Sequence, residues 1–442
     1  MSKKLWRFGG WVLLGLSLTV VSQQARAQEP RPAWQPPDRA LVERARKILD
    51  QVPLVDGHND LPWEYRQRVK NQLAKIDLKT DTSKLEEPLH TDIPRLRQGG
   101  MGAQFWSVYI PVSISGPDAV KTVIEQIDVV HRLVERYPDV FEIALTADDV
   151  VRIHKAGKIA SLIGMEGGHS IDNSLGSLRQ LYNAGARYMT ITHSANTAWA
   201  DAATADPQHG GLTRFGEEVI REMNRLGMLV DLSHVSPETM KEAMAVSAAP
   251  VIFSHSSARA LTDHPRNVPD DVLRLMPEDG GVVMVTFVPS FVSDAVRAHG
   301  AEDDAVEARL KALYTGDPDR VKRELEAWRK ANPAPKATLV QVADHIDHVR
   351  KLAGVDHVGI GSDFDGITST PENLDGVEDF PVLLAELMRR GWKEDEIKKL
   401  VGLNALRAFR EAEKTAQRLQ KERPASDALI EDLDGAPAKP AS

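Results

Sequence analysis

Short apolar runs rich in β-branched residues recur along the chain, and each is followed by a polar loop and then by a helical pattern. Eight such runs cover residues 54–58, 103–111, 159–168, 187–194, 228–234, 250–256, 281–288 and 357–366. Between them, residues 117–136, 215–226 and 338–353 place apolar side chains near one face of a helix. Strands that are apolar throughout are typical of a parallel sheet covered by helices on both faces.

Eight strands alternating with helices is the number that closes a (β/α)8 TIM-type barrel, and we predict this α/β fold. An open, doubly wound sheet is the alternative, but no glycine-rich nucleotide-binding motif follows the first run. Residues 294–334 interrupt the alternation with a highly charged helical pattern. We therefore expect a helical insertion after strand 7, near the mouth of the barrel.

The two ends of the chain differ in composition from its middle. Residues 1–27 begin with basic residues, continue with an apolar run too short for a span of roughly 20 residues, and end in Ala25 and Ala27. This pattern predicts a secretion signal peptide and an exported protein, periplasmic or secreted. Residues 28–417 then form the barrel domain, and residues 418–442, rich in Ala, Pro, Asp and Lys, are expected to be a disordered tail.

Charge and cysteine content exclude several kinds of protein. The formal charge is -9, and loss of residues 1–27 removes four basic and no acidic residues, which moves it to -13. An acidic chain without a basic run is poorly suited to bind nucleic acid or an anionic membrane. The chain has no cysteine, which excludes disulfides, thiolate metal ligands and lipidation on cysteine, so we expect no stable membrane anchor.

Titratable residues gather at the carboxyl ends of the predicted strands. In a parallel barrel these ends meet at one face, where the loops build the active site. Histidine and carboxylate are the usual zinc ligands where thiolate is absent. Each residue alone is more often a surface group or a hydrogen-bonded core group, but together they predict a metal site. The set comprises Asp56, His58, Asp60, Glu166, His169, His193, Asp231, His234, His255, Asp363 and Asp365.

Local context distinguishes some members of this set. His58 and Asp60 are two residues apart, so an extended segment points both side chains the same way. Glu166 follows a buried apolar run, where an isolated charge is very costly and a metal or cation partner is expected. Asp363 lies in a glycine-flanked turn and could exchange protons with a metal-bound water. For Asp365, capping of a loop or helix is the better interpretation.

An arginine near the mouth could bind a substrate carboxylate with its two parallel N–H donors. Both Arg259 and Arg266 follow the sixth run. The sequence pattern by itself does not choose between them.

The motifs together resemble the membrane dipeptidase (renal dipeptidase) family over about residues 50–412. They are DGHND (56–60), GGMGAQFWSVYIP (99–111), EGGHSI (166–171), YMTITHSANTAWAD (188–201), VDLSH (230–234), FSHSSAR (253–259), RNVPDD (266–271) and GIGSDFDG (359–366). The resemblance implies a barrel that holds two zinc ions. It also implies hydrolysis of dipeptides, including some with a C-terminal D-residue, by a metal-bridging hydroxide, and a homodimer.

The resemblance also assigns roles by position. His58 and Asp60 would hold the first zinc, His234 and His255 the second, and Glu166 would bridge both. Further residues would act on the substrate: His193 on the developing oxyanion, Arg266 on the C-terminal carboxylate, and Asp363 as the acid/base.

The chain departs from the mammalian pattern at two places in the expected pocket. Phe291 stands where a substrate-lining tyrosine occurs, and the 294–334 insertion is absent from the mammalian members. The missing cysteines exclude their disulfide-linked state. A related metal-dependent amidohydrolase acting on N-acyl amino acids or lactams is an alternative that the same ligands would serve. A non-catalytic protein on a retained barrel is a second alternative, but no ligand is lost.

Overall fold

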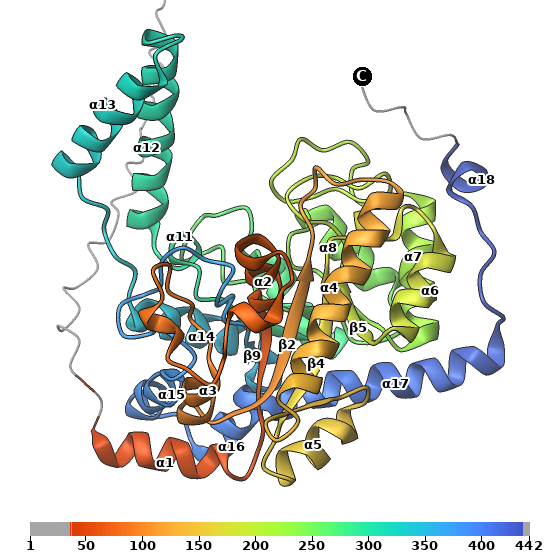
Figure 1. Cartoon of the computed structure of the whole chain (residues 1–442). Coiled ribbons are helices and arrows are strands. Elements are labelled where there is room, and N and C mark those ends of the chain that lie inside the picture. Colours follow the sequence, from red (N-terminus) through yellow and green to blue (C-terminus); the bar gives the residue numbers. More distant parts are fainter. Residues whose placement is uncertain (1–35, 37, 436–442) are drawn as a thin grey trace, which may run out of the picture. The chain divides into compact units, whose positions relative to one another are not determined.

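The barrel strands are buried along almost their whole length, as apolar strands covered by helices on both faces should be. In the computed structural model, which describes residue 36 and residues 38–435, nine strands form one parallel sheet (Figure 1). The expected signal peptide lies outside these residues. The strands are β1 (Leu54–Asn59), β2 (Met101–Tyr109), β3 (Phe141–Ile143), β4 (Ile159–Glu166), β5 (Ala186–Thr190), β6 (Leu229–Asp231), β7 (Ile252–Phe253), β8 (Val282–Val285) and β9 (Val358–Ile360).

Eight of the nine strands close into a barrel. The order runs β2-β1-β9-β8-β7-β6-β5-β4, and β4 pairs back onto β2 from Ala103↔Ala160 to Tyr109↔Glu166. These are the eight runs expected from the sequence, so the TIM-type prediction is confirmed and the open sheet is excluded. The additional strand, β3, pairs only with the start of β4 and was not predicted.

Helices surround the barrel, and those expected from periodicity are confirmed as α4, α7 and α14. The longer helices are α1 (Arg39–Leu49), α2 (Leu61–Val69), α4 (Pro117–Arg136), α5 (Ala147–Lys155), α6 (Leu175–Asn183), α7 (Arg214–Leu226), α8 (Pro237–Val246), α14 (Leu339–Ala353), α15 (Phe380–Arg389) and α17 (Asn404–Glu422). The shorter ones are α3 (Ile93–Gln98), α9 (Asp270–Leu273), α10 (Met276–Asp279), α11 (Pro289–Val292), α16 (Glu394–Lys398) and α18 (Ile430–Asp434).

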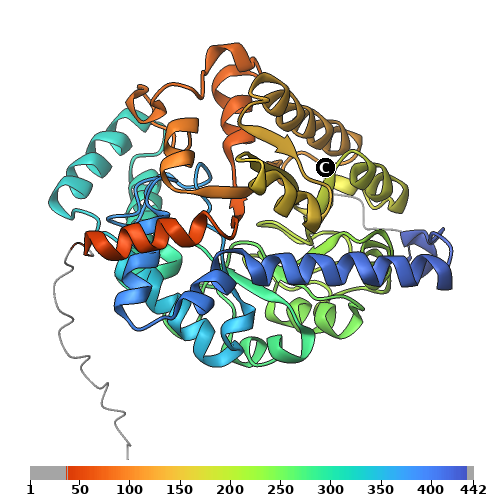
Figure 2. The same cartoon turned by 90° about the horizontal axis from the view of Figure 1, so that it is seen from below.

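The amino-terminal end of the barrel is covered by α17. Figure 2, seen from below, shows α17 crossing this end beside α1. Leu406 and Phe409 of α17 are buried in one apolar cluster with Val55, Leu162 and other side chains from the barrel. This end is therefore packed with apolar side chains, and polar chemistry is confined to the opposite end.

The insertion predicted after the seventh apolar run, which is β8, is a pair of helices, α12 (Asp294–Leu313) and α13 (Pro318–Ala331). Leu310, Val321 and Leu325 form a small core between the two helices, separate from the barrel core. The pair follows α11 and projects beyond the end of the barrel opposite to α17 (Figure 1). The expected position near the mouth is confirmed.

The prediction of a disordered tail over residues 418–442 is wrong for residues 418–435. Helix α17 continues to Glu422, and the following segment reaches α18, where Ile430 is buried. The carboxylate of Asp434 accepts a hydrogen bond from the hydroxyl of Thr213 (2.6 Å), at the start of α7. The composition concealed these contacts because few apolar side chains make them. Residues 436–442 lie outside the described part of the chain.

Among the described residues, none of the helices has the length and apolar character needed to cross a membrane. Residues 38–435 belong to one compact unit.

The backbone of Gly361 is packed directly against that of Ser254, with no room for a side chain. A Cβ at this position would lie 1.8 Å from the carbonyl oxygen of Ser254, a backbone atom that cannot move aside alone. Gly361→Ala should therefore lower the free energy of unfolding by about 1–3 kcal/mol or more, as overpacking does. Urea unfolding measures this, and Gly300→Ala is the control because a Cβ there meets nothing within 4 Å. Equal stability of Gly361→Ala and the wild type would contradict the packing described.

Candidate metal centre

The residues predicted from the strand ends meet at one place. A cavity of about 850 Å³ opens at the carboxyl ends of the barrel strands. His58 is fully buried and contacts Asp60 and Glu166 at the inner end of this cavity. The other predicted site residues line it: Asp60, Glu166, His193, His234, His255, Arg266, Phe291 and Asp363.

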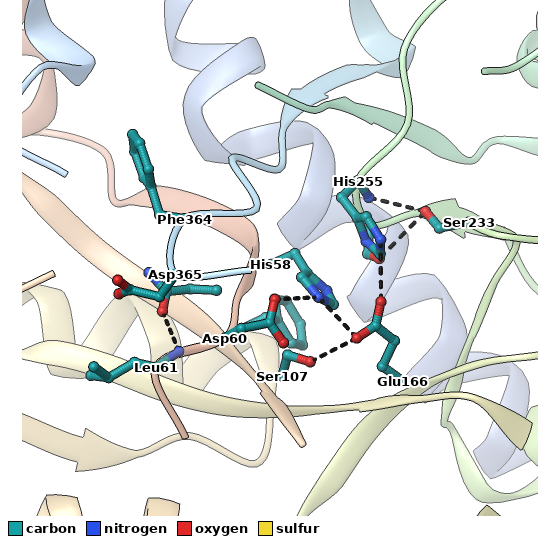
Figure 3. A network of polar contacts seen from close by, with 12 residues as sticks. His58, Asp60, Leu61, Ser107, Glu166, Ser233, His255, Phe364 and Asp365 are labelled. Atoms are coloured by element: carbon teal, nitrogen blue, oxygen red, sulfur yellow. Dashed lines mark hydrogen bonds and ion pairs between the residues drawn. The ribbon is translucent and has the colours of Figure 1, made fainter. Parts of the chain in front are cut away.

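Glu166 lies at the centre, and its two carboxylate oxygens face different donors. Oε2 is 3.5 Å from Nε2 of His58, which is 3.2 Å from Oδ2 of Asp60. Oε1 is 2.9 Å from Nε2 of His234 and 3.4 Å from Nε2 of His255. Figure 3 shows Glu166 between His58 and His255, with Asp60 beside His58. One carboxylate thus separates two sets of nitrogen and oxygen donors.

Several of these nitrogen and oxygen atoms, all able to bind a metal, face one another at short distance. Nε2 of His234 and Nε2 of His255 are 3.0 Å apart. Within the described part of the chain, Nε2 of His58 and Oδ1 of Asp60 are buried without a hydrogen-bond partner. Buried polar atoms are normally paired, so this arrangement fits bound cations. Two triads of close ligand atoms share Glu166: one with His58 and His255, the other with His193 and His234. The cluster is consistent with a binuclear metal site.

The ring of His58 is oriented by Tyr188, a residue that the sequence did not predict for the site. Nδ1 of His58 is 2.8 Å from the hydroxyl of Tyr188, which donates its own hydrogen to the carbonyl of Gly57 (3.2 Å). The hydroxyl therefore accepts from Nδ1–H, and Nε2 of His58 is the nitrogen that would bind a metal when the ring is neutral. Tyr188 lies within the buried strand β5, and nothing in the sequence distinguishes it from an ordinary core residue.

Burial sets the protonation of the other ligands. Burial, with the charges of neighbouring residues, holds the pKa of His234 and of His255 well below the usual range, so both rings are neutral near pH 7. Burial opposes ionisation of Glu166, but His58 and His193 outweigh it and hold the pKa of this carboxyl well below its usual range. Neutral imidazole and ionised carboxylate are the forms that bind metal.

Asp363 joins the first set of donors. One ligand atom from each of His58, Asp60 and Asp363 lies within 4.8 Å of the others. Its backbone has a positive φ of 67°, and its N–H donates to the carbonyl of His58 (3.1 Å), which turns the side chain into the cavity. Burial, reinforced by the charges of Asp60 and Glu166, raises the pKa of Asp363 well above its usual range. The carboxyl can therefore hold a proton near neutral pH.

Of the two candidate arginines, only Arg266 lines the cavity. It is 3% exposed, and its guanidinium donates to the carbonyl of His255 (3.4 Å) and to the hydroxyl of Ser256 (3.5 Å). Burial lowers the pKa of Arg266 to about 10, so it stays charged near pH 7. The guanidinium lies 5.4 Å from the ring centre of Phe291.

His193 covers the second set of donors. Its ring stacks on His234 with centroids 4.3 Å apart, and its Nε2 is 3.7 Å from Oε1 of Glu166. Burial, with a smaller effect of Arg266, lowers the pKa of His193. On the other side its ring contacts Tyr109 at 4.9 Å.

The sequence did not predict two aromatic residues of the cavity wall. Four of the predicted strand-end residues lie outside the groups of close ligand atoms: Asp56, His169, Asp231 and Asp365. Trp63 and Tyr109 pack edge to face at 5.1 Å and line the cavity; their signal was their position just after His58 and at the end of β2. Asp365 accepts a hydrogen bond from the backbone N–H of His90 (2.7 Å), in agreement with the expected loop-capping role.

The lowered pKa of His255 generates a prediction for the metal-free protein. Between pH 7.5 and 5.5 this histidine takes up a proton in the unfolded chain, near its ordinary pKa of 6.5, but not in the folded chain. Stability is therefore lost as the pH falls, by about 1 kcal/mol more in the wild type than in His255→Gln. Urea unfolding at both pH values measures the difference. An identical pH dependence of the two proteins would contradict a neutral, buried His255.

Comparisons with known proteins agree with this geometry. The profile of the family described as membrane dipeptidase (peptidase family M19) matches residues 42–423. Dipeptidase verJ of Clonostachys rogersoniana is 40% identical over 391 residues, which cover 86% of this chain and 89% of that protein.

Solved structures of similar fold include two bacterial enzymes. The probable dipeptidase PvdM of Pseudomonas aeruginosa matches with a TM-score of 0.70 and 25% identity, over 86% of this chain and 100% of that one. A metallopeptidase of Rhodobacter sphaeroides, liganded with a phosphinate mimic of the dipeptide L-Ala-D-Ala, matches with a TM-score of 0.64 and 24% identity, over 82% and 99% of the two chains. The chain therefore belongs to the membrane dipeptidase family and is a dipeptidase.

Proposed function

We propose that this dipeptidase is a two-zinc enzyme that cleaves the peptide bond of dipeptides held by their C-terminal carboxylate. One observation carries the proposal: the two oxygens of Glu166 face separate donor sets in a cavity that the buried, charged Arg266 also lines. Nitrogen and carboxylate donors without thiolate suit zinc.

The proposed ligands fall into two groups, one beside each carboxylate oxygen of Glu166. His58 and Asp60 would hold one zinc on the Oε2 side, and His234 and His255 the other on the Oε1 side. Two zinc ions would polarise the peptide carbonyl and lower the pKa of a bound water. Glu166 would bridge the two ions through its separate oxygens.

Arg266 is the proposed clamp for the substrate carboxylate. A guanidinium binds a carboxylate through two parallel hydrogen bonds, and burial strengthens this pairing. Because Arg266 donates to the carbonyl of the ligand His255, its distance from the metal centre is fixed. A dipeptide then places its one peptide bond at the metals, while a longer peptide places the wrong bond there.

Two further residues complete the proposed chemistry. His193 stacks on His234 at the cavity wall, where its ring can donate to the oxygen on which negative charge develops. Asp363, with its raised pKa, can carry a proton and deliver it to the leaving amine. Phe291, beside Arg266, would contact the C-terminal residue without offering a hydroxyl.

The proposal also covers the stereochemistry of the substrate, the location of the protein and its oligomeric state. The Rhodobacter sphaeroides relative was solved with a mimic of L-Ala-D-Ala, which supports acceptance of some C-terminal D-residues. The pattern of residues 1–27 supports export to the periplasm or beyond, and the family resemblance supports a homodimer.

The proposed activity is tested with a panel of dipeptides, including L-Ala-D-Ala, beside N-acyl amino acids and a lactam. The purified mature chain should cleave dipeptides, lose activity with a metal chelator and regain it with zinc. Preference for N-acyl amino acids or lactams would favour the amidohydrolase alternative. Absence of chelator-sensitive dipeptide cleavage would contradict the proposal.

The clamp has its own test. Arg266→Ala should raise KM for dipeptides by roughly 10–100-fold, because a hydrogen-bonded charge pair contributes about 1.5–3 kcal/mol. Arg259→Ala is the matched control, since Arg259 follows the same strand but does not line the cavity. Dipeptide amides, which lack the carboxylate, should lose little with either variant. An unchanged KM for dipeptides in Arg266→Ala would refute the clamp.

A further inference from the structure

A second buried carboxylate, Asp231, lies next to the metal centre but does not line the cavity. It ends β6, and it is fully buried. Four hydrogen bonds reach its two oxygens. Oδ1 accepts from the backbone N–H groups of Ser233 (3.1 Å) and Ser254 (2.8 Å), and Oδ2 accepts from the hydroxyls of Thr190 (2.5 Å) and Ser254 (2.6 Å).

These bonds take the place of a regular ladder between β6 and β7. Strand β7 is only two residues long, and the two strands share the single pair Asp231↔Ile252. Beyond that pair, the backbone N–H of His255 turns to the hydroxyl of Ser233 (3.0 Å; Figure 3). The chain entering His255 is thus held by side chains anchored on Asp231.

The hydroxyl of Ser254 has one hydrogen, and Asp231 receives it. The same oxygen lies 2.8 Å from Nδ1 of His255. A hydroxyl whose hydrogen is committed to a carboxylate can only accept from a neighbour, so Nδ1 of His255 must carry the ring hydrogen. Nε2 is then left with its lone pair, directed at Oε1 of Glu166 and at Nε2 of His234.

We infer that Asp231 is a positioning residue for the metal centre: through Ser254 it fixes the tautomer of His255 that can bind a metal. The inference rests on the proposed function and extends it to a residue that touches neither metal nor substrate. A carboxylate, a serine and a histidine then form a chain of the kind that commonly orients metal-binding imidazoles, with the serine inserted between the other two.

His58 and His255 are oriented by the same logic with different residues. In each case Nδ1 faces a hydroxyl whose hydrogen goes elsewhere: to the carbonyl of Gly57 from Tyr188, and to Asp231 from Ser254. In each of the two donor sets, one histidine ring therefore has its orientation and tautomer set before a metal binds. Nδ1 of His234, by contrast, has no hydrogen-bond partner among the described residues.

The chain offers a closely matched pair of variants. Ser254→Ala and Thr190→Val each remove one hydroxyl donor from the same oxygen of Asp231. Only Ser254→Ala breaks the connection to His255. A merely structural role of Asp231 predicts similar effects of both variants, whereas the positioning role separates them.

The experiment measures zinc binding by the metal-free chain in competition with a chromophoric chelator, together with the midpoint of urea unfolding. Ser254→Ala should weaken the binding of one of the two zinc ions by about 10–100-fold, the range typical of lost support for a ligand. Thr190→Val should keep zinc affinity within about threefold of the wild type, although it should lower the urea midpoint about as much as Ser254→Ala does.

Asp231→Asn gives a spectroscopic test. Its amide can donate to the hydroxyl of Ser254, which frees the serine hydrogen to point at Nδ1 of His255. Long-range ¹H–¹⁵N NMR of the metal-free protein should then show His255 shifting toward the tautomer protonated on Nε2, with Asp231→Glu retaining the wild-type tautomer if it folds.

The outcomes separate this inference from the proposed function. If the wild type binds fewer than two zinc ions, the proposed function fails. If it binds two, but Ser254→Ala and Thr190→Val bind zinc equally well, or the wild-type ring carries its hydrogen on Nε2, the positioning role of Asp231 is overturned.

Discussion

The site depends on one buried carboxylate. Glu166 ends a fully buried strand, and its two oxygens lie within 3.5 Å of three imidazole nitrogens. An isolated ionised carboxylate at such a position would be strongly unfavourable, so the surrounding residues must supply positive charge or a metal. Arg266 is a buried arginine of this cavity, but its guanidinium is directed to the carbonyl of His255 and to Ser256 rather than to Glu166. Bound cations at the proposed metal centre would satisfy both Glu166 and the unpaired buried atoms of His58 and Asp60.

The parallel barrel makes this arrangement possible because it separates two environments. Its amino-terminal end is closed by apolar side chains under α17, while every strand delivers its last residues to the opposite end. Two neighbouring pairs, β6 with β7 and β1 with β9, share a single residue pair each, and buried side chains complete these connections. Asp231 joins β6 to β7, and Asp56 joins β1 to β9 by accepting from the backbone N–H and the hydroxyl of Ser362, both at 2.7 Å. In both places the serine directly precedes a site residue, His255 or Asp363.

The sequence predicts the parts of this design that repeat or that carry unusual residues. Eight apolar runs reveal the barrel, and polar residues at their ends, such as His58 and Glu166, reveal the site. Contacts between strands cannot be predicted from a single position. Tyr188 and Ser254 look like ordinary buried residues in the sequence, and only the fold brings their hydroxyls to Nδ1 of His58 and of His255. The C-terminal segment was misjudged because its contacts, such as Asp434 with Thr213, are polar and isolated.

The central claim is that Glu166 bridges two metal ions, and a crystal structure with anomalous data at the zinc edge tests it most directly. Two anomalous peaks about 3.5–4 Å apart are expected in crystals of the zinc-loaded protein. One peak should lie beside Oε2 of Glu166 with His58 and Asp60, and the other beside Oε1 with His234 and His255. A single peak, or two peaks that do not share Glu166, would contradict this claim.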